Sequence, residues 1–106
     1  MLSEKPSKHS STLMAMRIEH QPESQRYVLI DGEAVVGEVE YVKAGDTLSL
    51  VRAEVPLELR GQGLGIPLVR GTLEAIRDEG GLTIVPVCPY IAKFMMKNTE
   101  FDDLRA

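Results

Sequence analysis

The hydrophobic pattern of this chain changes its period at Pro56. Before that residue, short runs rich in apolar residues cover 16–20, 27–30, 34–42 and 47–55, and within 34–42 apolar and polar residues alternate. This alternation predicts β-strands, because successive side chains of a strand point to opposite faces. After Pro56, apolar residues recur every three or four positions, as on one face of an amphipathic helix. The chain must therefore pack helices from its second half against strands from its first half.

Turn signals join the predicted strands into an antiparallel meander. Asp31-Gly32 lies between two β-rich runs and predicts a type I′ hairpin turn, which needs positive φ at both central residues. Ala44-Gly45-Asp46 supplies the next turn. The strand between these turns is predicted to place one set of side chains on a common face, namely Val35, Gly37, Val39 and Tyr41.

The predicted strand over 47–55 changes phase partway along. Its apolar residues up to Leu50 follow one alternation, and those from Val51 onward follow the other. A slip of one residue is what a β-bulge leaves in a sequence, and a bulge would part this strand from a neighbour and free backbone groups for a ligand. A strand buried on both faces gives the same pattern without a bulge, so both interpretations stay open.

The second half of the chain predicts a helix, a strand and another helix. The first helix begins near Leu64, with Pro67 in its first turn, and Gly80-Gly81 ends it. Residues 82–87 are predicted as a buried strand, parallel to an earlier one because a helical crossover precedes it. Residues 89–98 form the second helix. Its inward residues are Ile91, Phe94 and Met95. The predicted fold class is α/β, an antiparallel β-meander followed by β-α-β-α on one mixed sheet.

Length and composition bound the domain organisation and the partners. The 106 residues suit one domain, predicted over 14–106, after a disordered lead over 1–13 that is rich in Ser, Lys and Pro. The single cysteine, Cys88, excludes an internal disulfide and favours a reducing, cytoplasmic location. A net charge of −4 argues against nucleic acid as a partner. No apolar run has the length of a membrane span.

The residues best suited to bind a ligand form the loop before the first helix, Leu59-Arg60-Gly61-Gln62-Gly63-Leu64-Gly65. Alternate glycines let the backbone approach a ligand closely. Their N–H groups and the helix dipole favour an anion such as a pyrophosphate, with Arg60 as a nearby cation. Two other phosphate loops do not fit, since no lysine follows the glycines and Ile66 stands where a dinucleotide fingerprint needs its third glycine. A tight turn without a ligand is the structural alternative.

Arg60-x-x-Gly63-x-Gly65 is similar to the R/Q-x-x-G-x-G/A pyrophosphate loop of the GNAT superfamily of acetyl-CoA-dependent N-acyltransferases. From Arg17 to Leu104, the chain resembles a small subfamily of short acetyltransferase-like domain proteins. The resemblance implies acetyl-CoA as cosubstrate, an amine acceptor, and a V-shaped opening beside the bulged strand. It implies that CoA is held by Val55, Arg60, Gly61, Gln62, Gly63, Leu64 and Gly65. The acetyl thioester would then end near Glu54 and Cys88.

The chain departs from the family pattern at two places. The subfamily usually carries His-Thr before its Glu-Val pair, whereas this chain has Arg52-Ala53. An arginine cannot serve as a general base, because it does not lose its proton in proteins. Larger family members place a tyrosine general acid on the last helix, where residues 94–97 offer none.

Three side chains are candidates for proton transfer or covalent chemistry. Cys88 precedes a helix N-terminus that favours the thiolate, and the alternative is a buried, inert cysteine. Glu54 could accept a proton from an ammonium group or be a solvated carboxylate. Tyr90 could act as an acid or simply pack with its hydroxyl outward. His9 and His20 lack the spacing of metal ligands, so we expect them at the surface and expect no metal.

These residues leave three functions open. The leading one is transfer of an acetyl group from acetyl-CoA to an unidentified amine, by direct attack or through an acyl-Cys88 intermediate. The alternative is a module that binds CoA or acyl-CoA without turnover. The third is an interaction domain that uses only the fold.

Overall fold

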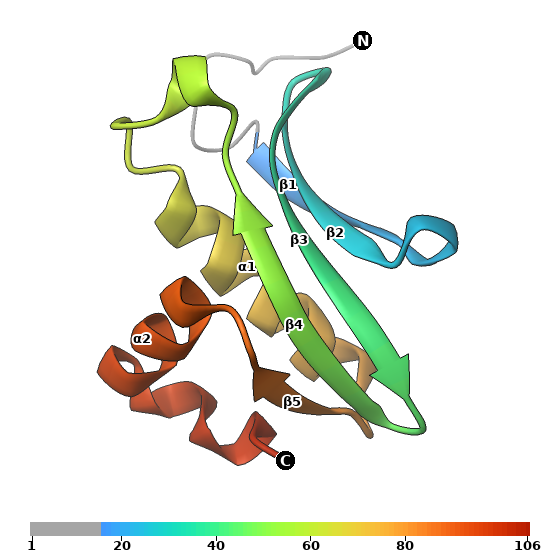
Figure 1. Ribbon diagram of the computed structural model, residues 1–106. Helices are drawn as coiled ribbons and strands as arrows, with labels where there is room; N and C mark the ends of the chain where they lie inside the picture. Colours follow the sequence, from blue (N-terminus) through green and yellow to red (C-terminus); the bar gives the residue numbers. More distant parts are fainter. Residues whose placement is uncertain (1–15) are drawn as a thin grey trace, which may run out of the picture.

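The computed structural model describes residues 16–106 as one five-stranded sheet with helices on one side (Figure 1). The disordered lead predicted over 1–13 lies outside the described residues, as does His9. In chain order the elements are β1 (Met16–Gln21), β2 (Arg26–Asp31), β3 (Ala34–Ala44), β4 (Thr47–Glu54), α1 (Gly65–Glu79), β5 (Thr83–Pro86) and α2 (Pro89–Lys97). Short 3₁₀ turns cover Pro22–Ser24, Leu57–Leu59 and Thr99–Leu104.

The strands lie side by side in the order in which they occur in the chain. β1 to β4 form an antiparallel meander, and β5 is added at the edge of β4 in the parallel direction. The helix α1 makes the crossover between β4 and β5 and packs across β1 to β4, whereas α2 packs against β4 and β5. This arrangement confirms the predicted fold class and the predicted mixed sheet.

The core lies between α1, α2 and one face of the sheet. One face of α1 is buried, with Leu73 and Ile76 fully inaccessible to solvent. The predicted inward residues of α2 are buried as well, namely Ile91, Phe94 and Met95. Burying one large aliphatic side chain contributes about 1.5–3 kcal/mol, so this interface dominates the stability of the domain.

The predicted bulge in β4 is confirmed. Glu40 pairs with Arg52 and Tyr41 pairs with Leu50, so Val51 has no partner on β3. Leu50 is fully buried, whereas the side chain of Val51 is 39% exposed. A strand buried on both faces, the other interpretation of the phase change, is therefore wrong. The extra residue turns the alternation over, so that Ala53 packs against the core and Arg52 is exposed.

A second bulge, in β3, corrects the predicted placement of Val35. Leu29 pairs with Gly37 and Ile30 pairs with Val35, so Val36 is the additional residue. Val36 is buried and Val35 is 49% exposed, on the face away from the helices. The sequence could not reveal this slip, because two adjacent valines fit either phase equally well.

The turn between β2 and β3 also differs from the expected type. Asp31 pairs with Ala34, so the two central residues are Gly32 and Glu33. Only Gly32 has positive φ, at 64°. This matches the glycine-first pattern of a type II′ turn and not the type I′ turn that Asp31-Gly32 predicted.

β4 and β5 pair only along the first half of β4. Their register runs from Thr47 opposite Thr83 to Leu50 opposite Pro86. One further hydrogen bond follows, from the N–H of Cys88 to the carbonyl oxygen of Leu50 at 2.9 Å. Beyond the bulge, β4 continues along β3 while the chain after β5 turns into α2 (Figure 1). Among residues 16–106, one edge of β4 beyond Leu50 is thus left without a neighbouring strand.

We expect this free edge to be visible in native-state hydrogen exchange. Amides over 51–55 that point away from β3 should exchange faster than the amides over 38–41, because local opening is easier where ladder partners are missing. Two-dimensional NMR after transfer into heavy water measures both sets in one experiment. Equal protection of the two sets would show that the edge is closed in solution.

Candidate functional site

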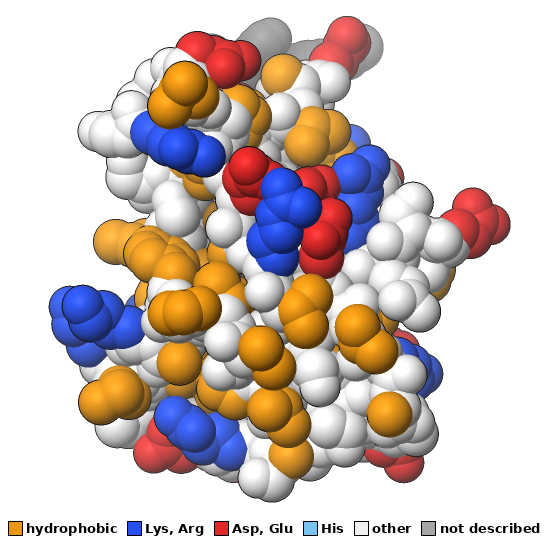
Figure 2. Space-filling view, viewed as in Figure 1, with side chains coloured by type: hydrophobic (Ala, Val, Ile, Leu, Met, Phe, Trp, Pro, Cys, Tyr) orange, Lys and Arg blue, Asp and Glu red, His pale blue; other side chains and the backbone are white. Residues whose placement is uncertain are grey.

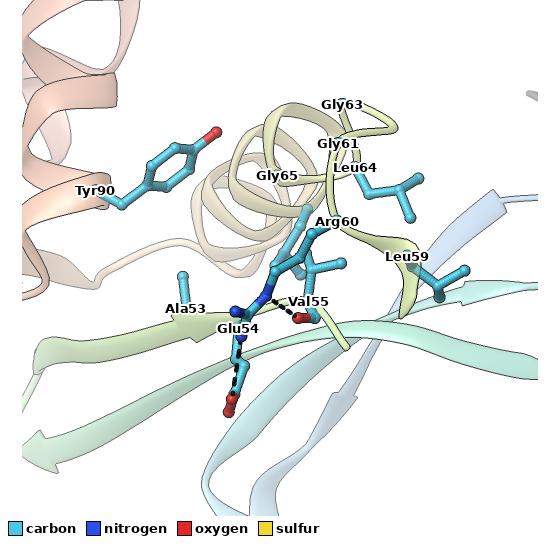
Figure 3. A pocket seen from close by; sticks show the side chains of 11 residues that line it. Ala53, Glu54, Val55, Leu59, Arg60, Gly61, Gly63, Leu64, Gly65 and Tyr90 are labelled. Carbon is cyan, nitrogen blue, oxygen red and sulfur yellow. Dashed lines mark hydrogen bonds and ion pairs between the residues drawn. The ribbon is translucent and has the colours of Figure 1, made fainter. Parts of the chain in front are cut away.

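A cavity of about 470 Å³ lies where β4 leaves β5 (Figure 3). Its walls come from the end of β4, the loop that follows, the start of α1 and the first turn of α2. The lining residues are Ala53, Glu54, Val55, Leu59, Arg60, Gly61, Gly63, Leu64, Gly65, Leu68 and Tyr90. The structure therefore brings together all predicted site residues except Gln62 and Cys88.

Two glycines of the loop are needed for their backbone conformation. The 3₁₀ turn Leu57–Leu59 carries the chain away from β4, and the N–H of Arg60 closes it on the carbonyl of Leu57 at 3.2 Å. The loop then passes through positive φ at Gly61 (89°) and Gly63 (75°). A Cβ atom at either position would meet nothing within 4 Å. Conformational strain, not lack of space, is what disfavours other residues there.

The loop and the start of α1 present a row of backbone donors. Within the part of the chain that the structure describes, the N–H groups of residues 61–66 donate no hydrogen bond, and no side chain caps α1. The first backbone bond of the helix is from Leu68 to the carbonyl of Leu64 at 3.1 Å. Unengaged N–H groups at the positive end of a helix form an anion-binding site.

Gly65 is needed for a different reason, because the ring of Tyr90 leaves no room for a side chain at this position. A Cβ atom on Gly65 would lie 2.6 Å from the Tyr90 hydroxyl oxygen. The half-exposed tyrosine thus leans from α2 over the first turn of α1 and forms a wall of the cavity (Figure 3). The sequence left two roles open for Tyr90, an acid or a side chain that only packs. The structure places the Tyr90 side chain in the lining of the cavity. The one sequence signal of the close approach between Tyr90 and α1 was Gly65. It is a glycine in a helix, where the backbone does not need positive φ.

Glu54 lies between two arginines. Its carboxylate pairs with Arg52 and stands 3.8 Å from the guanidinium of Arg60. Arg60 also donates from Nε to the carbonyl oxygen of Val55 at 3.0 Å. Figure 3 shows Ala53 and Glu54 on opposite sides of β4, so the carboxylate points away from the core. Arg60, the predicted cation of the loop, therefore contacts β4 and does not lie against the N–H groups of residues 61–66.

Arg52 belongs to a charged cluster on the outer face of the sheet. Its guanidinium pairs with Glu54 and lies 3.6 Å from Glu40. Figure 2 shows Lys or Arg side chains gathered with Asp or Glu side chains in a cluster on the surface. The carboxylate of Glu54 raises the pKa of Arg52 above its ordinary value, and Glu40 adds to this. Arg52 therefore stays cationic, in accord with the expectation that it cannot replace a histidine base.

Cys88 occupies the predicted chain position but has a buried side chain. It is the residue before α2, at the end of β5. Its side chain is 8% exposed and packs in the hydrophobic core. The thiol is not among the groups that line the cavity. Its catalytic role stays a prediction.

A separate polar cluster on the outer strands does not line the cavity. His20 is exposed, as predicted, and its Nε2 lies 2.7 Å from the hydroxyl oxygen of Tyr41. Its ring stacks on Tyr27, with ring centroids 4.2 Å apart. Burial, with Glu79 nearby, raises the pKa of both tyrosines. Both hydroxyls consequently stay protonated at neutral pH.

Residues 16–106 contain no group of three or more His, Cys, Asp or Glu side chains arranged to hold a metal ion. None of the helices described has the length and apolar character needed to cross a membrane.

A protein family and a solved structure are similar to this chain. A family model described as GCN5-related N-acetyltransferase matches residues 26–104. The solution NMR structure of a GCN5-like protein from Staphylococcus aureus superposes with a TM-score of 0.63. That match covers 87% of this chain and 89% of the other at 21% identity, and it bears on the fold alone. A search of curated proteins found no match.

The two kinds of glycine predict responses to alanine of different size. Gly63→Ala should lower the free energy of unfolding by about 1–2 kcal/mol, because a Cβ atom strains a backbone at positive φ. Gly65→Ala should change it by less than about 1 kcal/mol, since the half-exposed Tyr90 ring can swing away. Urea denaturation measures both values. The reverse order would contradict our account of the loop.

Proposed function

The chain belongs to the GCN5-related N-acetyltransferase family, and from this premise we propose that it transfers an acetyl group from acetyl-CoA to an amine at the cavity beside β4. The observation that carries the proposal is the row of unengaged N–H groups over 61–66. It stands next to the edge of β4 that the bulge at Val51 leaves free. A donor row and a free strand edge together suit a ligand with both phosphate and amide groups.

The residues present fit CoA at both ends of the cavity. The N–H groups over 61–66, including that of Gln62, would hold the pyrophosphate. The edge of β4 at Ala53 to Val55 would pair with amide groups of the pantetheine arm, as an added strand does. The carbonyl of Val55 is one backbone acceptor of this segment, and in the free protein it accepts a hydrogen bond from Arg60. When bound, acetyl-CoA would supply the thioester that donates the acetyl group.

Glu54 and Tyr90 are the groups placed to move protons. An alkylammonium group has an ordinary pKa of about 10.4 and attacks only after losing a proton, which Glu54 can accept directly or through water. The nitrogen then bonds to the acetyl carbon as the carbon–sulfur bond breaks, and the second proton of the nitrogen passes to water. The Tyr90 hydroxyl, at the wall of the cavity, can donate a proton to the departing sulfur. This direct route uses only side chains that line the cavity.

A route through acyl-Cys88 is the alternative chemistry. It needs the thiol to reach the thioester, and Cys88 packs in the core, outside the cavity. Burial of this kind supports direct attack, because a thiolate nucleophile works in a partly exposed, electropositive setting.

A CoA-binding module without turnover is the second candidate function. The observation that favours it is Arg52, a permanent cation where the resembling subfamily carries a histidine. Binding of CoA depends on the loop and not on that position, so loss of turnover would leave binding intact. We propose a cytoplasmic location on the basis of the lone cysteine.

The anion site is tested by two substitutions that differ only in charge. Asparagine and aspartate tolerate positive φ about equally, so Gly63→Asn and Gly63→Asp should be similarly strained. We expect the aspartate variant to bind CoA about tenfold or more weakly than the asparagine variant, because its carboxylate faces the phosphate. Isothermal titration calorimetry measures both. Equal affinities would place the pyrophosphate elsewhere, and a wild-type protein indifferent to CoA would overturn the proposed function.

The route of transfer is tested with Glu54→Gln and Cys88→Ala. Glu54→Gln should slow acetyl transfer to an amine about 100-fold or more, the range of a lost general base, without loss of CoA affinity. Cys88→Ala should retain the rate within about threefold, and intact wild-type protein should gain no adduct of about 42 mass units from acetyl-CoA.

The opposite outcomes are equally informative. An acetyl adduct on the wild type that is absent from Cys88→Ala would establish the covalent route. CoA binding without turnover on any amine of a broad panel would favour the binding module.

A further inference from the structure

A groove lies between the start of α1 and one face of α2, next to the cavity described above. Its volume is about 360 Å³, which is within the range of ligand pockets, roughly 300–1,000 Å³. Tyr90 lines both the cavity and the groove. Ile66, in the first turn of α1, also lines the groove. The groove therefore begins where the row of unengaged N–H groups over 61–66 ends.

The groove is positively charged, although the chain has a net charge of −4. Arg70, Lys93 and Lys97 line it, and no Asp or Glu of residues 16–106 is among the lining residues. Arg70 is already engaged, since it pairs with Glu100 at 2.6 Å and donates to Oδ1 of Asn98 at 2.9 Å. Lys93 and Lys97 are exposed, and neither makes an ion pair within residues 16–106. Two cations are therefore available to an anion.

The spacing of the two lysines lets them act on the same anion. Lys93 and Lys97 are four residues apart on α2, and side chains at this spacing are neighbours on a helix surface. Like charges at this spacing destabilise a helix, and a bound anion would remove that repulsion. A lysine ammonium binds phosphate as a point charge with three N–H donors. The pair therefore suits a phosphate group.

The other side chains of the groove are largely apolar or aromatic. Ile66 is 55% exposed and Tyr90 is 46% exposed, so both present surface to a ligand. The buried ring of Phe94 also lines the groove. The guanidinium carbon of Arg70 lies 5.5 Å from the centroid of this ring, which fixes the ring in place. Surfaces of this kind bind the flat face of a nucleic-acid base.

We propose that this groove is a second phosphate site, which takes a phosphate joined through a sugar to a planar base. Lys93 and Lys97 would bind the phosphate, and Ile66 and Tyr90 would contact the base. One source of such a group is the nucleotide end of the CoA whose pyrophosphate would lie at the N–H groups over 61–66, and this source rests on the proposed function. The other source is a separate nucleotide, which does not depend on it.

The probe is adenosine 3′,5′-bisphosphate, which has the base and phosphates but neither a pantetheine arm nor a thioester. By NMR of the full chain labelled with ¹⁵N, we expect its amide shifts to include residues 90–98. Inorganic phosphate should bind about tenfold more weakly, because it lacks the base that stacks on aromatic and apolar side chains. Shifts confined to residues 61–66, or equal affinities for the two probes, would overturn the second site.

Lys43 provides the matched control. It is an exposed lysine on β3 that lines neither the cavity nor the groove. Lys93→Gln and Lys97→Gln should each weaken binding of the bisphosphate about three- to fivefold, the size of an exposed ion pair. Lys43→Gln removes the same charge and should change the affinity less than about 1.5-fold. Equal effects of the three variants would reflect net charge alone and would overturn the site.

CoA and dephospho-CoA, which lacks the 3′-phosphate, distinguish the two sources. If the groove holds the end of CoA, Lys97→Gln should weaken binding of CoA as it weakens that of the bisphosphate, and leave dephospho-CoA unaffected. If a separate nucleotide occupies the groove, the substitution should weaken only the bisphosphate. CoA that shifts no amide over 61–66 would overturn the proposed function and the first source. The bisphosphate would still decide whether the groove is a phosphate site.

Discussion

One unpaired residue, Val51, determines how the rest of this molecule is arranged. Up to Leu50, β4 is paired on both sides, and Leu48 and Leu50 are buried beneath the helices. A slip of the register would turn both leucines to solvent, so the bulge cannot migrate along the strand. Beyond Val51, β4 stays paired with β3 but is no longer paired with β5. The opening between the strands, the free edge of β4 and the outward direction of Glu54 all follow from that one insertion.

The loop that completes the site combines two separate constraints on glycine. Gly61 and Gly63 allow a backbone path on which the N–H groups over 61–66 have no acceptor among the described residues, and a Cβ atom at either glycine would meet only open space. Gly65 has ordinary backbone angles and makes room for Tyr90 from a different helix. The first constraint is local to the loop, whereas the second links α1 to α2. The cavity therefore depends on how the two helices pack as much as on the loop motif.

This distinction explains what the sequence could and could not predict. The strands and both helices follow from periodicity. The break in alternation near Val51 left a bulge and a strand buried on both faces as two open interpretations, and only the register of β3 and β4 decides between them. The bulge at Val36 was hidden by two adjacent valines, and the turn at Gly32 by a glycine that either turn type accepts. Tyr90 reaches the cavity through the packing of α2 against α1, which no local pattern contains. The position of Cys88 was predictable, but its burial depended on the same long-range packing.

Charge on the outer face of β4 places the proposed proton chemistry at one residue. Arg52 remains a cation, and Arg60 cannot accept a proton either. Glu54 is the one carboxylate among the residues that line the cavity. It is therefore the side chain on which we propose that proton transfer from the amine depends. The ion pair with Arg52 keeps a cation beside this carboxylate independently of Arg60.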